Sequence, residues 1–253
     1  MKRFLLVLLT QSIFSACYAQ EGKTPIYLGL QVSPNFSYRV LSNNSGEPSV
    51  DDEIDYLNNR EDAAFGYRIA AVGGLRVSNN WTLEAGVAYV ENCTNFNLTT
   101  GDQPDPRRGF VFEESLESLD LKNCLAYVGI PIRIIWNFGT DKAKVMASFG
   151  LSPQILLNQR TLATRSYKNG DEEQLEIENF EDAAGFNLSP SFGIGAEYML
   201  SQRFFLRAEG IARFGVVNVN EDSPINSNLY SSELNVGIYY SLAKNKNGDA
   251  NTL

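Results

Sequence analysis

Residues 122–138 read KNCLAYVGIPIRIIWNF, and one parity of this stretch is almost entirely apolar. The apolar positions are Ala126, Val128, Ile130, Ile132, Ile134, Trp136 and Phe138. The positions between them carry Tyr127, Gly129, Pro131, Arg133 and Asn137. Because successive side chains of a β-strand point to opposite faces, this alternation predicts one strand with an apolar face and a mixed polar face.

Seven further stretches of the chain show the same alternation. The eight runs cover approximately residues 26–38, 65–77, 81–95, 122–138, 144–158, 185–200, 203–217 and 230–243. Each run is longer than the usual soluble strand of about five or six residues, and a strand tilted through a bilayer needs about 9 to 11 residues. The links between runs alternate long and short. This rhythm is typical of an all-β fold, an eight-stranded antiparallel up-and-down transmembrane β-barrel.

The N-terminus has the pattern of a secretory signal peptide. A short basic region is followed by the apolar stretch FLLVLLTQSIF, and small residues at Cys17 and Ala19 favour cleavage after residue 19. Lipoprotein processing at Cys17 is the alternative. The predicted organisation is therefore a signal peptide at 1–19, a barrel domain at 25–243 and a polar C-terminal tail at 244–253. No later run is long and apolar enough for a transmembrane helix.

The mixed face of the eight runs collects charged residues of both signs. They are Arg68, Arg76, Glu84, Arg133, Glu197, Arg207, Glu209 and Arg213. In lipid every backbone polar group must be paired internally, so the sheet must close with its apolar face outward. An eight-stranded barrel has a lumen just wide enough for side chains to fill. We therefore predict a charge network that plugs the lumen.

Alternation alone does not tell the inner face of a barrel from the outer one. A soluble or lipid-anchored barrel that binds a small apolar ligand inside is the alternative. The loop rhythm, the mixed signs of charge and aromatic residues near strand ends favour the membrane. The predicted aromatic girdle consists of Trp81, Trp136, Phe138, Tyr198 and Phe204.

Two cysteines remain if Cys17 leaves with the signal peptide. Cys93 and Cys124 lie on adjacent predicted strands, and both have the parity of the outward face. A register that places Trp81 opposite Trp136 also places Cys93 opposite Cys124. An exported chain permits disulfide formation, so a cross-strand disulfide is one hypothesis and two free cysteines are the other.

The net charge of −9 is concentrated in the long links, at about residues 39–64, 96–121 and 159–184. We interpret these acidic segments as a solvated, repulsive external rim; binding of divalent cations that bridge lipopolysaccharide is the alternative. The predicted partners are outer-membrane lipid and lipopolysaccharide, with protein partners at the external loops or strand extensions. An acidic chain is a poor nucleic-acid binder.

The chain contains no histidine, which excludes a Ser-His-Asp triad and the commonest metal ligand. The inward residues Glu84, Glu197 and Glu209 are the remaining acid/base candidates, but neighbouring arginines favour salt bridges for them. We predict a protein that is not an enzyme and has no cofactor or metal site.

The chain resembles the PorT-like family of small outer-membrane β-barrel proteins over about residues 25–243. The resemblance is carried, in order, by Tyr127–Pro131, Gly150–Pro153, Gly193–Tyr198 and Arg207–Gly210. It implies an eight-stranded barrel in the cell outer membrane, without enzymatic activity, and some such proteins are linked to secretion. A polar tail follows Leu242 here, where such barrels usually end on an aromatic residue. The expected role is structural or adhesive, or that of a component of a membrane assembly.

Overall fold

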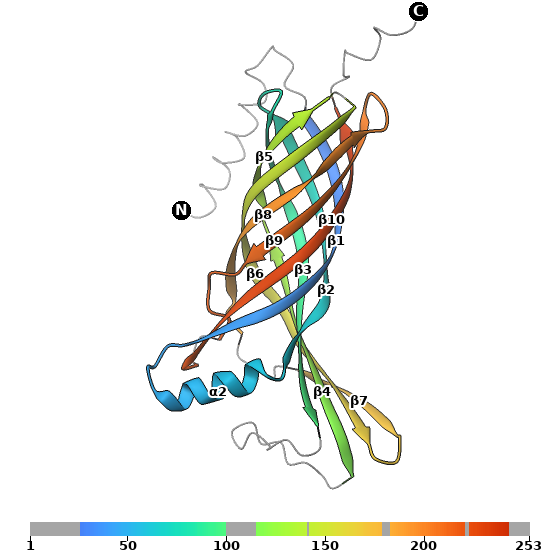
Figure 1. The fold of residues 1–253 in the computed structure, drawn as a ribbon. Coiled ribbons are helices and arrows are strands. Elements are labelled where there is room, and N and C mark those ends of the chain that lie inside the picture. Colours follow the sequence, from blue (N-terminus) through green and yellow to red (C-terminus); the bar gives the residue numbers. More distant parts are fainter. Residues whose placement is uncertain (1–25, 100–114, 141, 179–182, 221–222, 243–253) are drawn as a thin grey trace, which may run out of the picture.

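A computed structural model describes residues 26–99, 115–140, 142–178, 183–220 and 223–242. The predicted signal peptide and C-terminal tail lie outside these ranges. The described chain forms long antiparallel strands that tilt around a closed ring (Figure 1). The strands are β1 Ile26–Asn43, β2 Glu61–Arg76, β3 Trp81–Thr99, β4 Leu116–Gly129, β5 Ile132–Gly139, β6 Ala143–Tyr167, β7 Glu172–Glu178, β8 Phe186–Met199, β9 Phe204–Phe214 and β10 Ile225–Ser241, and one helix, α2, covers Pro48–Asn58.

The ring closes because β1 pairs with both β2 and β10, so that Tyr27 lies opposite Gly74 on one side and Ser241 on the other. The sheet has ten strands. However, β4 and β5 are two halves of one strand interrupted at Pro131, and β7 and β8 follow each other along the same side of β6. The ring therefore contains eight strand positions, which confirms the predicted fold class.

The two faces of the wall differ as a membrane requires. On β1, Leu30 is 63% exposed on the outer face, whereas the adjacent Gln31 is 1% exposed in the lumen. The same contrast recurs on the other strands, with apolar residues outside and polar ones inside. The alternative of a soluble barrel with an apolar interior is therefore wrong. Among the described residues no helix is long and apolar enough to cross a membrane.

The barrel has two unlike ends. At the turn end, short turns join β2 to β3, β5 to β6 and β8 to β9, and β1 begins beside the end of β10. At the loop end, β3, β4, β6 and β7 continue beyond the other strands as a projecting sheet, which we call the external sheet (Figure 1). The predicted links at 96–121 and 159–184 are thus partly wrong, because strands reach Thr99 and Tyr167 and a further hairpin strand, β7, follows.

Two bulges explain why the alternation in sequence ends before the strands do. β2 has one residue more than β3 between Ala63 and Tyr67. β6 has one residue more than β4 at about Leu156. Because an extra residue reverses which parity faces inward, Gln154 and Gln159 are both buried in the lumen despite their opposite parity.

The first long link, predicted to be a loop, contains α2. Pro48 stands in its first turn, where a missing N–H costs nothing. Val50, Ile54 and Leu57 recur at helical spacing and are buried. They pack on a cluster at the loop end that contains Phe96, Leu98, Leu116, Leu119, Leu121, Ala163 and Ile225. The helix therefore covers apolar side chains at the loop end of the barrel.

Candidate functional site: the lumen network and the external sheet

Glu84 on β3 is the centre of the lumen. Its carboxylate accepts hydrogen bonds from Tyr27 Oη at 2.7 Å and Gln31 Nε2 at 3.1 Å. It also forms ion pairs with Arg133 Nη2 at 2.6 Å and Arg207 Nη1 at 2.8 Å. The side chain is 1% exposed. One buried carboxylate thus holds two guanidinium groups from β5 and β9.

The ion pairs continue outward from these two arginines. Arg133 Nη1 lies 2.7 Å from Glu209 Oε2, and Arg207 Nη2 lies 3.0 Å from Glu197 Oε2. The other oxygen of Glu197 lies 2.6 Å from Arg76 Nη2. Together with Glu84, these residues form a continuous network of three glutamates and three arginines, which we call the central network. Its charges balance.

The two other predicted lumen residues lie apart from the central network. Arg213 Nε pairs with Glu233 Oε1 at 2.7 Å. Arg68 is 1% exposed and forms no ion pair with the described residues. The sequence analysis did not name Glu233, although this residue lies in the predicted run 230–243 and has the parity of Asn235.

An aromatic layer lies beside the central network. The rings of Phe205 and Tyr239 stack with centroids 4.8 Å apart, and Tyr27 meets Phe205 edge-on at 5.2 Å. The Arg207 guanidinium lies 4.5 Å from the Tyr239 centroid. A Cβ at Gly74 would be 2.0 Å from the Tyr27 ring. This glycine is therefore needed for the close approach of the Tyr27 ring to the wall.

The residues of the predicted girdle lie on the outer face near the turn end. Trp81 and Trp136 are neighbours on β3 and β5, with centroids 6.4 Å apart, and Phe138 is 5.2 Å from Trp136. Phe204 contacts Tyr240, and Lys142 lies over the ring of Tyr198. A second set of aromatic contacts flanks the apolar band nearer the loop end: Phe36–Phe65, Tyr38–Tyr230, Phe214–Tyr230 and Tyr67–Tyr89.

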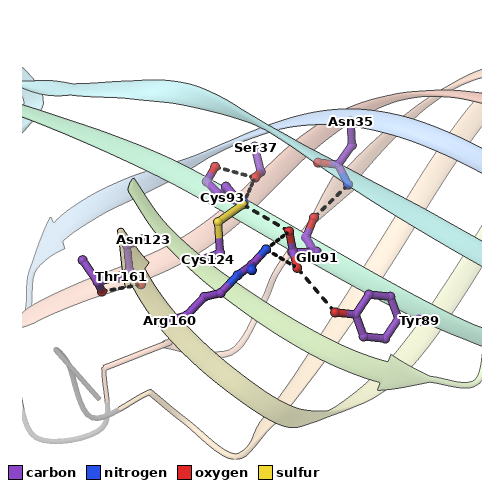
Figure 2. The surroundings of a disulfide bond; sticks show 9 residues. All are labelled: Asn35, Ser37, Tyr89, Glu91, Cys93, Asn123, Cys124, Arg160 and Thr161. Atoms are coloured by element: carbon purple, nitrogen blue, oxygen red, sulfur yellow. Dashed lines mark hydrogen bonds and ion pairs between the residues drawn. A yellow bond between two sulfur atoms is a disulfide. The ribbon is translucent and has the colours of Figure 1, made fainter. Parts of the chain in front are cut away.

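Cys93 and Cys124 lie opposite each other and form a disulfide between β3 and β4 (Figure 2). The sequence analysis placed both on the exposed outward face, but they are 0% and 2% exposed. Ala64 packs with the disulfide, and Glu91 on the same strand face approaches Cys93 Sγ at 4.0 Å. The Cys93–Cys124 disulfide is therefore buried at the base of the external sheet.

The β2 bulge next to this disulfide is bridged by a side chain of β1. Where β2 and β3 lose their pairing, Ser37 Oγ accepts from the Cys93 N–H at 2.7 Å and donates to its carbonyl at 2.7 Å (Figure 2). Arg160 Nη2 lies 3.0 Å from Glu91 Oε1. Through hydrogen bonding and charge, Glu91 raises the pKa of Arg160, which stands beyond the apolar band of β6. Both features fix the base of the external sheet.

The wall opens between β1 and β2 near the loop end. Their pairing ends at Ser37 and Ala64, although β1 continues along β10 to Asn43. A pocket of about 320 Å³ lies there, lined by Tyr38, Arg39, Val40, Leu41, Asn58, Glu61, Asp62 and Thr94. The ion pair of Arg39 with Glu61 crosses it. This opening is lateral, between two neighbouring strands.

Metal ligands are sparse in the part of the chain that the structure describes. The single group of three there is Glu91, Cys93 and Cys124, whose two sulfur atoms are bonded to each other. The external carboxylates of the described ranges form no such group.

The strands form a tilted ring with an apolar outer band, aromatic residues on both sides of that band and a charged interior. These features define a transmembrane β-barrel. A family model described as outer membrane protein beta-barrel domain matches residues 18–216. The chain belongs to this family and is an outer-membrane β-barrel protein. In such barrels the long links are extracellular, so the loop end is the external end.

Solved structures similar to this chain include three bacterial surface or outer-membrane proteins. Neisserial surface protein A is 14% identical, with 85% of this chain and 96% of that chain covered and a TM-score of 0.41. Ail, the attachment invasion locus protein of Yersinia pestis, is 10% identical, with 87% and 99% covered and a TM-score of 0.35. OprG from Pseudomonas aeruginosa is 8% identical, with 87% and 96% covered and a TM-score of 0.37. A search of curated protein sequences finds no match.

Proposed function

We propose that this protein is a closed, non-enzymatic barrel that holds the external sheet at the cell surface as a docking edge for a protein partner. The observation that carries the proposal is the external sheet itself. It projects beyond the barrel, is stapled by the Cys93–Cys124 disulfide and ends in the hairpin strand β7 (Figure 1). A role as a component of a secretion-related assembly, as in some PorT-like proteins, uses the same edge.

The free edge of β7 is the part of the sheet suited to a partner. β7 pairs with β6 on one side, and no described strand pairs with its other side. An unpaired edge offers backbone N–H and C=O groups to an added strand. Glu172, Glu173 and Glu176 on this strand are exposed, as is Leu175. Such an edge favours a basic, extended peptide that contains apolar residues.

Binding of a model strand tests this docking edge. A peptide of alternating lysine and valine should bind the detergent-solubilised protein, and the double variant Glu172→Lys/Glu176→Lys should weaken its affinity at least about tenfold, because like charges on paired strands repel. Fluorescence anisotropy of the labelled peptide gives the dissociation constants. The matched control, Asp52→Lys/Asp55→Lys on α2, makes the same charge change away from β7. Equal weakening by both variants would show non-specific attraction and refute the docking edge.

The lumen supports the other half of the proposal, a barrel without an aqueous pore. Side chains of the central network meet across the lumen from β2, β3, β5, β8 and β9 at hydrogen-bond distance. An eight-stranded barrel has little room beyond such side chains.

Planar-bilayer recording tests the plug. We expect the reconstituted protein to give no conductance steps above the bilayer background, because opening the lumen requires breaking buried ion pairs. A refolded sample is verified first by its faster gel migration without boiling. Regular, stable conductance steps from such a sample would make the protein a pore and overturn the plugged lumen.

A further inference from the structure

The lumen contains a local excess of positive charge. The central network has three arginines and three glutamates, but the neighbouring group consists of Arg68, Arg213 and Glu233. These three residues are 1%, 4% and 5% exposed. Glu233 lies opposite Asn35 on β1, and Ser33, two residues earlier on the same strand, lies opposite Arg68 on β2. Two guanidinium groups therefore share one carboxylate in a buried space.

The donors of this group are not used by the described residues around them. Arg68 Nη1 and Nη2, Arg213 Nη2 and Asn235 Nδ2 are buried without a hydrogen-bond partner in the described part of the chain. The oxygen of the same amide, Asn235 Oδ1, accepts from Ser33 Oγ at 2.9 Å, and Ser33 lies opposite Arg68 in the ladder. Arg68 and Asn235 thus stand on either side of Ser33, on β2 and β10.

Burial of an uncompensated charge is among the costliest features a fold can have. The central network cannot supply the missing charge, because each of its carboxylates is already paired with arginine. Water could satisfy the donors but would leave the excess charge in place. The required species is an anion with acceptor capacity for guanidinium and amide N–H groups.

We propose that the lumen binds one small monovalent inorganic anion of the halide type between Arg68, Arg213 and Asn235. The anion neutralises the local excess and accepts the unused N–H groups. Two acceptors of the same region, Asn35 Oδ1 and Glu233 Oε2, are also without a partner among the described residues. These two oxygens are acceptors and cannot donate to the anion. They therefore suit an anion that keeps some of its hydration water, which can donate to them. Because the group is enclosed, a large organic anion such as gluconate cannot replace it.

Thermal unfolding in two sodium salts of equal ionic strength tests the site. In sodium chloride the apparent melting temperature, read from the loss of the unboiled gel band, should exceed that in sodium gluconate. An anion present at about ten times its dissociation constant gives a shift of about 3–6 °C for a chain of this size. In Arg68→Met, which removes the excess charge, this salt difference should disappear. The control Arg165→Met, at an exposed arginine of the external sheet, should keep it.

Two results would refute the site: equal melting temperatures of the wild type in the two salts, or an unchanged salt difference in Arg68→Met. Anomalous diffraction from wild-type crystals grown with sodium bromide gives a readout that needs no variant. The expected result is a bromide peak in the lumen at contact distance from the Arg68 guanidinium. Bromide peaks confined to the outer surface, with only water beside Arg68, would show hydration and no anion site.

Discussion

Replacing Glu84 with glutamine is expected to lower the free energy of unfolding of the barrel by about 3–5 kcal/mol, the usual cost of removing one partner of a buried ion pair. Glutamine has nearly the same shape, so the loss reflects charge. Arg133 and Arg207 would each lose a carboxylate at 2.6 Å and 2.8 Å. Their remaining partners, Glu209 and Glu197, would then face more cations than they can balance.

Equilibrium unfolding in urea, followed by tryptophan fluorescence in detergent micelles or lipid vesicles, measures this loss. The matched control is Glu172→Gln, the same chemical change on exposed β7, for which we expect a change below about 0.5 kcal/mol. If the two variants unfold at the same urea concentration, the central network contributes nothing to stability. The side chains of the central network would then fill the lumen without stabilising it through their charges.

Two features of the sequence explain how Glu84 and Arg133 meet in the central network. Period two placed Glu84 and Arg133 on the inner face, and the register that pairs Trp81 with Trp136 also pairs these two residues directly. Closure of the ring then brings Arg207 from β9 across the lumen to the same carboxylate. Which arginine contacts which glutamate depends on strand tilt and stagger, which alternation does not encode.

The features that the sequence analysis missed have two causes. A bulge reverses the parity of a strand without changing its composition, so the continuation of β6 beyond Asn158 looked like a loop. The sequence analysis expected strand extensions at the external end, but for this reason it ended the strand now seen as β6 too early. The helix α2 did carry a signal, since Val50, Ile54 and Leu57 have helical spacing, but an acidic link between strands had been assigned to solvent.

The disulfide shows how a correct pairing can still give a wrong environment. The register rule placed Cys93 opposite Cys124, as the structure has it. Parity alone placed them on the exposed outer face. Ala64 packs with the disulfide and Arg160 lies opposite Cys124 on β6, and both residues lie close to one of the two bulges. The disulfide therefore lies at the boundary between the regular barrel and the external sheet.

Removing this disulfide is expected to loosen the external sheet while the barrel stays closed. The disulfide closes a loop with a sequence separation of 31 residues, for which chain entropy gives about 3–4 kcal/mol. The ladder of the membrane-spanning strands does not depend on it. The double variant Cys93→Ser/Cys124→Ser should therefore retain the faster gel migration of the unboiled protein.

The loosened sheet should become accessible to trypsin, because β4 and β6 carry Lys122 and Arg165. We expect cleavage there to be faster by about a hundredfold or more, since each 1.4 kcal/mol is a factor of ten in the open population. Mass spectrometry of the fragments gives the rate at each site. Dithiothreitol should have the same effect on the wild type and none on the double variant. Equal cleavage rates for wild type and variant would mean that β-sheet pairing and the α2 cluster hold the external sheet without the disulfide.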